Sequence, residues 1–212
     1  MKKFNFPLDA FQASRLVRSV RSKKDIIALW MNAIKLIAVY EKPDADLIAG
    51  HLVLHVGKMS RLFVENGKKS FSTSFPFSIY EKNCGLEFGA SACPEVDSKV
   101  TSDILSLING HDVFESSNVL AFADPLIELT GDQDVVWQLL RDLMLVDDGY
   151  IRIDHDPVNE NGALHPLDHI DIFYSQAATF KIGLGGHVGL DVFHDILNTK
   201  SDCHYLGAST AT

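Results

Sequence analysis

Apolar residues recur at helical spacing through the first third of the chain. The pattern predicts three helices in turn: an amphipathic one, one that is apolar almost all round, and one that ends before Asn66-Gly67. These helices are expected at residues 8–22, 24–40 and about 43–64. Helices of this kind bury their apolar faces against another element. We therefore expect residues 1–66 to form a helical layer.

Beyond residue 66 the pattern changes to strands mixed with helices. Aromatic and small residues in 71–92 are typical of two short strands. Three more strands are predicted at 151–156, 167–174 and 178–184, and three helices at about 97–110, 133–146 and 188–197, the second after a Thr130-Gly-Asp-Gln133 capping box. The expected fold class is α+β, with N-terminal helices packed on a mainly antiparallel sheet and a C-terminal helix. We expect a single domain, residues 1–212, with the α+β sheet region at 67–212.

The last three predicted strands carry the residues with candidate chemistry. Successive side chains of a strand point to opposite faces, so each of these strands has an apolar face and a polar face. If the strands are neighbours in one sheet, their polar faces converge, and the loop at 157–166 adds a histidine at the rim. The residues brought together in this way are Asp154, Asp156, His165, His169, Asp171 and Lys181.

Two interpretations of this polar face are open. Carboxylates and neutral imidazoles bind Mg²⁺, Mn²⁺ or Zn²⁺, so the candidate metal ligands are Asp154, Asp156, His169 and Asp171. A histidine can transfer a proton and a lysine can stabilise charge on a phosphoryl oxygen, so the candidate catalytic residues are Asp154, His165, His169 and Lys181. The alternative is structural, because antiparallel sheets commonly leave one face in water, where charged residues need no further role.

Charge is distributed unevenly along the chain. The net charge is −9, yet residues 1–24 carry seven basic groups and one acid, which makes +6 and leaves −15 on the remainder. A basic arm on an acidic body can bind nucleic acid or an acidic partner, and the candidate contacts are Arg15, Arg18 and Arg21. The alternative is that these arginines form the solvated stripe of the first helix.

Two further groups of histidines are assigned no role. His51 and His55 stand four residues apart in the presumed third helix, where core histidines are the commoner case. The last predicted helix is expected to have a solvated face formed by His187, Asp191, His194 and Asp195. Three cysteines without a C-x-x-C spacing indicate neither a disulfide framework nor a thiolate zinc site. With no signal peptide expected, the predicted location is the cytoplasm.

Three short segments share a distinctive pattern of basic, acidic and histidine residues. They read Arg152-Ile-Asp154-His-Asp156-Pro157, His165-Pro166-x-x-His169-Ile-Asp171 and Phe180-Lys181-Ile-Gly-Leu. In these segments the chain resembles a bacterial family, the domain-of-unknown-function family 2290. The chain departs from the family pattern twice, with His155 where tyrosine is frequent and Asp171 where a histidine is usual. The resemblance implies a bacterial protein of the kind found in mobile or phage-defence gene clusters, beside a larger protein partner. It implies no particular activity.

Two functions follow as expectations. The first is a small component of a bacterial multi-protein assembly, of the phage-defence kind, that acts through contacts with a larger protein partner or a nucleic acid and not with a membrane. The alternative is a metal-dependent phosphodiesterase, a nuclease, that uses the His/Asp cluster on the sheet face. A divalent metal is expected only for the second function.

Overall fold

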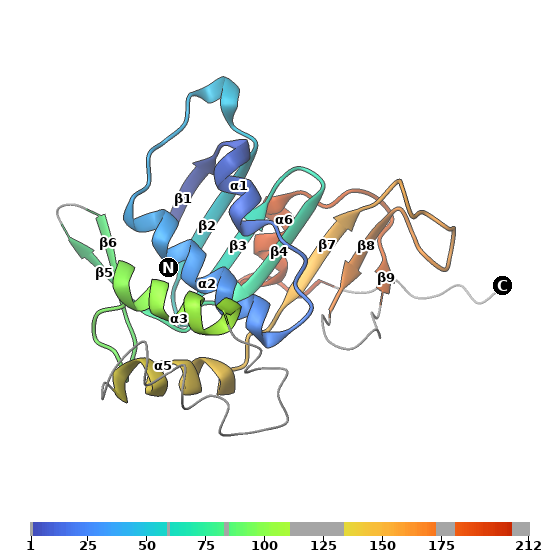
Figure 1. The fold of residues 1–212 in the computed structure, drawn as a ribbon. Helices are drawn as coiled ribbons and strands as arrows, with labels where there is room; N and C mark the ends of the chain where they lie inside the picture. The colour runs from blue at the N-terminus through green and yellow to red at the C-terminus, as the bar shows by residue number, and fades with distance from the viewer. Residues whose placement is uncertain (1, 59, 83–84, 111–133, 173–180, 205–212) are drawn as a thin grey trace.

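The computed structural model describes residues 2–58, 60–82, 85–110, 134–172 and 181–204, and its fold is α+β around one antiparallel sheet (Figure 1). The sheet has seven strands in the order β1-β2-β3-β4-β7-β8-β9. These strands are β1 (Lys2–Leu8), β2 (Gly50–Val56), β3 (Arg61–Glu65), β4 (Lys69–Ser74), β7 (Ile151–His155), β8 (Asp168–Asp171) and β9 (Lys181–Gly183). The expected fold class is confirmed.

The other elements flank this sheet. They are the hairpin β5 (Ser78–Lys82) and β6 (Gly85–Gly89), the 3-10 helix η1 (Ala45–Leu47), and the helices α1 (Ala10–Leu16), α2 (Lys23–Ala38), α3 (Ser98–Gly110), α5 (Asp134–Leu145) and α6 (Leu190–Ile196). The helices predicted at 97–110, 133–146 and 188–197 are therefore confirmed. The capping box at 130–133 lies outside the described residues. Among the described helices, none is long and apolar enough to cross a membrane.

Helix α2 anchors the helical layer on the sheet. It begins with a capping box, in which the Ser22 hydroxyl accepts from the Asp25 amide and the Asp25 carboxylate accepts from the Ser22 amide. Trp30 is fully buried, and its indole N–H donates to Thr73 Oγ1 at 2.9 Å and to the Ser74 carbonyl at 2.8 Å. Because the ring is buried and its N–H is satisfied, Trp30 joins helix and sheet without an unpaired polar group.

Both faces of β2 and β3 are buried. Helices α1 and α2 cover one face, where the core contains Leu52, Leu62 and Phe71 (Figure 1). Helix α6 packs on the other face, where Phe193 lies in a second apolar cluster with Val53, Phe63 and Ile153. The sheet is thus enclosed between two layers over β2 and β3.

The third helix predicted at about 43–64 is wrong, because this segment forms η1, β2 and β3. Both faces of β2 and β3 are buried, and each strand has three consecutive apolar residues at its centre, at 52–54 and 62–64. Such a run does not show the alternation of a half-exposed strand. A strand, β1, also precedes α1, and α1 ends at Leu16 instead of residue 22. Residues 1–66 therefore supply three strands of the sheet as well as two helices, and are not a helical layer.

Two histidines meet in the core beneath α6. His55 lies on β2 and not on a helix, and its ring centroid is 4.6 Å from that of His194. The solvated face expected for α6 is found at His187, Asp191 and Asp195 but is wrong for His194, which is 6% exposed. Burial lowers the pKa of both histidines, and the neighbouring His55 and Lys3 help to lower that of His194 to about 4.

This pair predicts acid sensitivity. An unfolded histidine titrates near 6.5, so the unfolded chain binds protons more readily than the folded one as the pH falls from about 6.5 towards 4. The stability is present above this window and is lost within it, and we expect a loss on the order of 2 kcal/mol. Urea unfolding at a series of pH values measures it, and His194→Phe should flatten the profile. The exposed His204→Gln is the control, and an identical profile in His194→Phe would contradict the prediction.

Candidate functional site

The candidate site lies on the part of the sheet that the helices leave uncovered. In the register of β4 and β7, Phe71 pairs with Arg152 and Lys69 with Asp154. Arg152 and Asp154 therefore continue the same face that α1 and α2 cover further along the sheet, while β8 and β9 extend beyond these helices (Figure 1). The polar face of β7–β9 thus adjoins the helical layer, and the apolar face turns towards α6.

The predicted convergence of polar residues is confirmed for β7, β8 and β9. Asp154 pairs with His169, and Asp171 pairs with both Arg152 and Lys181 across neighbouring strands. One ligand atom from each of Asp154, His169 and Asp171 lies within 4.8 Å of the others. All three side chains are buried, so this is a shielded cluster and not a water-facing surface.

Two cations neutralise the two carboxylates of the cluster. Arg152 donates to Asp154 Oδ2 from Nε at 2.9 Å and also binds Asp171 through Nη2. Lys181 Nζ lies 3.2 Å from Asp171 Oδ1 and 2.9 Å from His169 Nε2. Removing ionised groups from water costs several kcal/mol per ion unless each is paired and hydrogen-bonded. Arg152, to which the sequence analysis assigned no role, is therefore central to the site.

His169 is held in the orientation that a metal ligand needs. Its Nδ1–H donates to the Pro166 carbonyl at 2.8 Å, so Nε2 carries the lone pair and faces the cluster. Nε2 is 3.8 Å from Asp154 Oδ2 and 3.9 Å from Asp171 Oδ1. A backbone carbonyl that fixes the second ring nitrogen is the usual support of a metal-binding histidine.

One buried acceptor in the cluster lacks a partner. Asp154 Oδ1 accepts no hydrogen bond within the described part of the chain, although buried carboxylate oxygens normally do. Lys181 holds a position between His169 and Asp171 that a divalent ion would also favour. These residues fit a metal with nitrogen and oxygen ligands, provided that the lysine moves aside.

Two of the predicted residues lie at the rim and not in the cluster. The carboxylate of Asp156 accepts from Asn159 Nδ2 at 2.9 Å, and this hydrogen bond lowers the pKa of Asp156. Asp156 Oδ2 lies 3.6 Å from His165 Nε2, and Asp156 does not belong to the group of ligand atoms formed by Asp154, His169 and Asp171. The ring of His165 is 4.8 Å from that of His169, at the predicted edge of the site.

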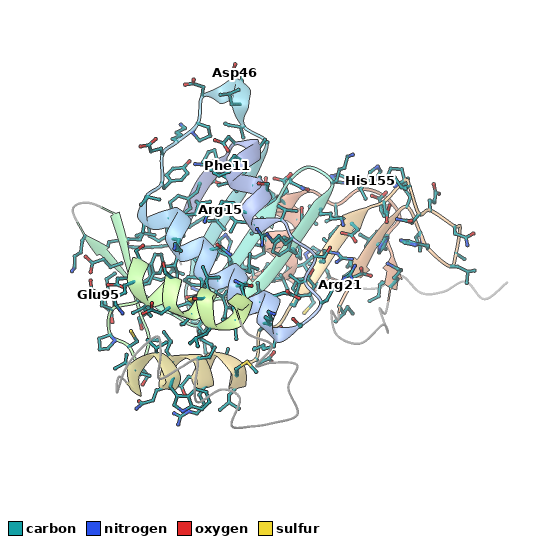
Figure 2. The ribbon with its side chains drawn as sticks, viewed as in Figure 1. Phe11, Arg15, Arg21, Asp46, Glu95 and His155 are labelled. Atoms are coloured by element: carbon teal, nitrogen blue, oxygen red, sulfur yellow. The ribbon has the colours of Figure 1, made fainter. Side chains whose placement is uncertain are left out.

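A second His/Asp group lies on the opposite face of the same strand pair. His155 Nδ1 is 2.8 Å from Asp168 Oδ1, and His187 Nδ1 is 3.8 Å from the same oxygen. Within the described residues no lysine or arginine pairs with Asp168. His155, labelled in Figure 2, is partly exposed, and His187 is exposed. Sequence reasoning missed this group, although the alternation of β7 and β8 places His155 and Asp168 on one face.

The basic arm reaches the candidate site through one of its three arginines. Arg15 lies in the last turn of α1, whereas Arg18 and Arg21 lie between α1 and α2, and all three are exposed. Arg15 and Arg21 are labelled in Figure 2. A pocket of about 260 Å³ is lined by Val17, Arg18, Ser19, Asn66, Lys69, Phe71 and Arg152. Arg18 and Lys69 have no carboxylate at ion-pair distance among the residues with described positions. The pocket therefore joins the arm to the charged cluster.

Comparison with known proteins adds no relative. No family model matches the chain, and neither a curated protein nor a solved structure is similar to it. The function must therefore be inferred from the residues and geometry of this chain. Two features carry that inference: the basic pocket, and the buried cluster of Asp154, His169 and Asp171 beside it.

Proposed function

We propose that this chain is a small component of a bacterial multi-protein assembly and contacts the phosphate backbone of a nucleic acid through the basic pocket. The observation that carries the proposal is the pocket itself. Arg18, Lys69 and Arg152 come from three distant segments of a chain whose net charge is −9, and they line one pocket on one face. Clustered cations on an acidic protein are the electrostatic footprint of polyanion binding.

The groups around the pocket suit phosphate oxygens. Guanidinium and ammonium groups form charge-assisted hydrogen bonds with phosphate, and polar side chains such as Ser19 and Asn66 are further common donors. Arg152 is held in place by Asp154 and Asp171, so little side-chain entropy is lost when it binds. Contacts of this kind position a nucleic acid and do not read its sequence.

The resemblance to family 2290 supports the proposed setting of this activity. It favours a phage-defence assembly in the bacterial cytoplasm, in which a larger protein from the same gene cluster carries out the remaining steps. A small component that holds a nucleic acid by its backbone would be useful there whatever the sequence of the nucleic acid. Co-purification of the tagged chain with the product of a neighbouring gene would test this setting.

Replacing both Arg18 and Lys69 with glutamine is expected to weaken nucleic-acid binding and its dependence on salt. Binding releases fewer counterions from the DNA when a phosphate contact is lost. The slope of log K against log salt should therefore become shallower by about 0.9 per lost contact on duplex DNA. Fluorescence anisotropy with labelled duplex and single strands at several salt concentrations measures this. Lys42→Gln removes one charge from an exposed position outside the pocket and should change neither quantity. Equal slopes in wild type and double variant would reject the pocket as the contact.

A metal-dependent phosphodiesterase is a second candidate, favoured by the buried cluster next to the pocket. We propose that Asp154, His169 and Asp171 would hold a divalent ion, and such an ion would supply Lewis-acid chemistry by lowering the pKa of a water molecule. Lys181 would stabilise the charge that develops on the phosphoryl oxygens, and His165 at the rim would transfer a proton to the leaving oxygen. Cleavage of a labelled oligonucleotide in Mn²⁺ or Mg²⁺ that is lost in His169→Gln is the expected result.

A further inference from the structure

A second basic pocket lies on the other face of the sheet, between β2–β3 and the end of α6. Its volume is about 160 Å³, below the roughly 300 Å³ at which ordinary small-molecule pockets begin. No acidic side chain lines it within the described residues. The polar groups around it are His55, Lys58, Arg61, Asn198, Thr199 and Lys200.

Arg61 is a buried cation without a carboxylate partner in the described ranges. It is 6% exposed and donates from Nε to Ser72 Oγ at 3.0 Å and from Nη2 to the Gly149 carbonyl at 2.7 Å. These bonds use two of the five N–H donors of a guanidinium. Burial lowers the pKa of Arg61, and the carboxylates of Asp147 and Asp148 partly offset this effect. A buried charge of this kind is stabilised by a counter-charge.

His55 adds an unsatisfied group to the same pocket. It is 8% exposed, and its Nε2 has no hydrogen-bond partner within the described part of the chain. Burial and the charge of Lys3 lower the pKa of His55, so its ring is neutral at neutral pH and offers one N–H donor. A ligand with acceptor atoms would satisfy both His55 and Arg61.

The C-terminal end of α6 disfavours anion binding in this pocket. Its carbonyl groups carry partial negative charge, and Leu197–Lys200 follow it directly into the pocket wall. The helix has only seven residues, and the Ser201 hydroxyl and amide donate to carbonyls at its end. The three full charges of Lys58, Arg61 and Lys200 therefore outweigh this partial charge.

We infer that this pocket binds the phosphate group of a small ligand, with Arg61 and His55 at its base and Lys58 and Lys200 at its mouth. The donors come from β2, β3, the connection between them and the residues after α6, and guanidinium and ammonium groups form charge-assisted hydrogen bonds with phosphate oxygens. The volume admits one phosphate group and little more. The site lies across the sheet from the pocket of Arg18, Lys69 and Arg152, so it is independent of the proposed nucleic-acid contact.

Inorganic phosphate is the direct probe, measured by calorimetry and by thermal unfolding at constant ionic strength. We expect saturable binding and a higher melting temperature than in chloride. The exposed pair Lys58→Gln/Lys200→Gln should raise the Kd at least tenfold while leaving the fold intact. Lys42→Gln/Lys68→Gln removes the same charge elsewhere and should leave the Kd unchanged. No saturable binding by the wild type, or an equal Kd in both double variants, would overturn the inference.

The imidazole of His55 provides a separate readout. Phosphate beside it should shift its ring resonances in NMR spectra and raise its apparent pKa, because an anion stabilises the protonated ring. A tighter Kd for glycerol 3-phosphate than for inorganic phosphate would assign the site to a phosphate ester, and the reverse order to the free ion. Resonances of His55 that stay unchanged at saturating phosphate would show that the anion binds elsewhere and refute the assignment.

Discussion

Replacing Arg152 with methionine should lower the free energy of unfolding by about 3–5 kcal/mol, the largest effect we expect from a single change. Arg152 is the shared partner of Asp154 and Asp171, which are 3% and 1% exposed. Its removal leaves two buried carboxylates with Lys181 as their remaining lysine or arginine partner among the described residues, and of the two carboxylates Lys181 pairs only with that of Asp171. Urea unfolding at neutral pH measures the change.

Two further variants show whether the loss comes from unpaired charge. Arg141→Met breaks an exposed pair with Asp142 and should cost less than about 1 kcal/mol. Adding Asp154→Asn to Arg152→Met should recover part of the loss, because the carboxylate without another cation is then neutral. A small cost for Arg152→Met, similar to that of Arg141→Met, would mean that the cluster does not depend on this arginine.

A divalent metal should raise the stability of the wild type if the cluster of Asp154, His169 and Asp171 binds it. Metal that binds only the folded state stabilises it by about 2.7 kcal/mol at 100 times its Kd. We expect a higher melting temperature with Mn²⁺ or Zn²⁺ than with a chelator, and the loss of this difference in His169→Gln. The difference is a better readout than the melting temperature itself, since any change in a buried cluster alters stability.

His187→Gln is the matched control for this experiment. It removes an imidazole from the second group, His155, Asp168 and His187, on the other face of the same strands. If the metal effect survives in His187→Gln and disappears in His169→Gln, the buried cluster is the metal site. The reverse pattern would move the metal to the second group. A wild type that melts equally with metal and chelator would remove the phosphodiesterase proposal and leave the nucleic-acid contact in place.

The polar cluster was predictable because its strands keep one polar and one apolar face. Over 151–154 and 169–171 the alternation of polar and apolar residues places Asp154, His169 and Asp171 on one face, and neighbouring strands in antiparallel register bring them into contact. The same local logic predicts α3, α5 and α6, since each helix has one apolar stripe that recurs at helical spacing. Where a strand or helix has one apolar face and one polar face, the spacing of apolar residues along the chain predicts the element and its orientation.

The residues of β2 and β3 show where the pattern fails. Leu52, Leu54 and Leu62 pack beneath α1 and α2, and Val53 and Phe63 pack beneath α6, so the centre of each strand is apolar on both faces. Helix α6 comes from the far end of the chain and covers this face of the sheet. No residue within β2 or β3 indicates that this contact will form. The same contact also buries His194, for which the sequence predicts a solvated position, whereas a core position is the favoured interpretation for His55.

The sequence by itself determined the α+β class, the uneven charge and the side of the strands on which Asp154, His169, Asp171 and Lys181 lie. Only the tertiary structure decided which charges meet. It paired Arg152 with two carboxylates, brought Arg18 and Lys69 to the same pocket, and left Arg61 buried beside His55. The physical reason is that alternation depends on neighbouring residues, whereas ion pairs and pockets depend on segments that only the packing of sheet and helices brings together.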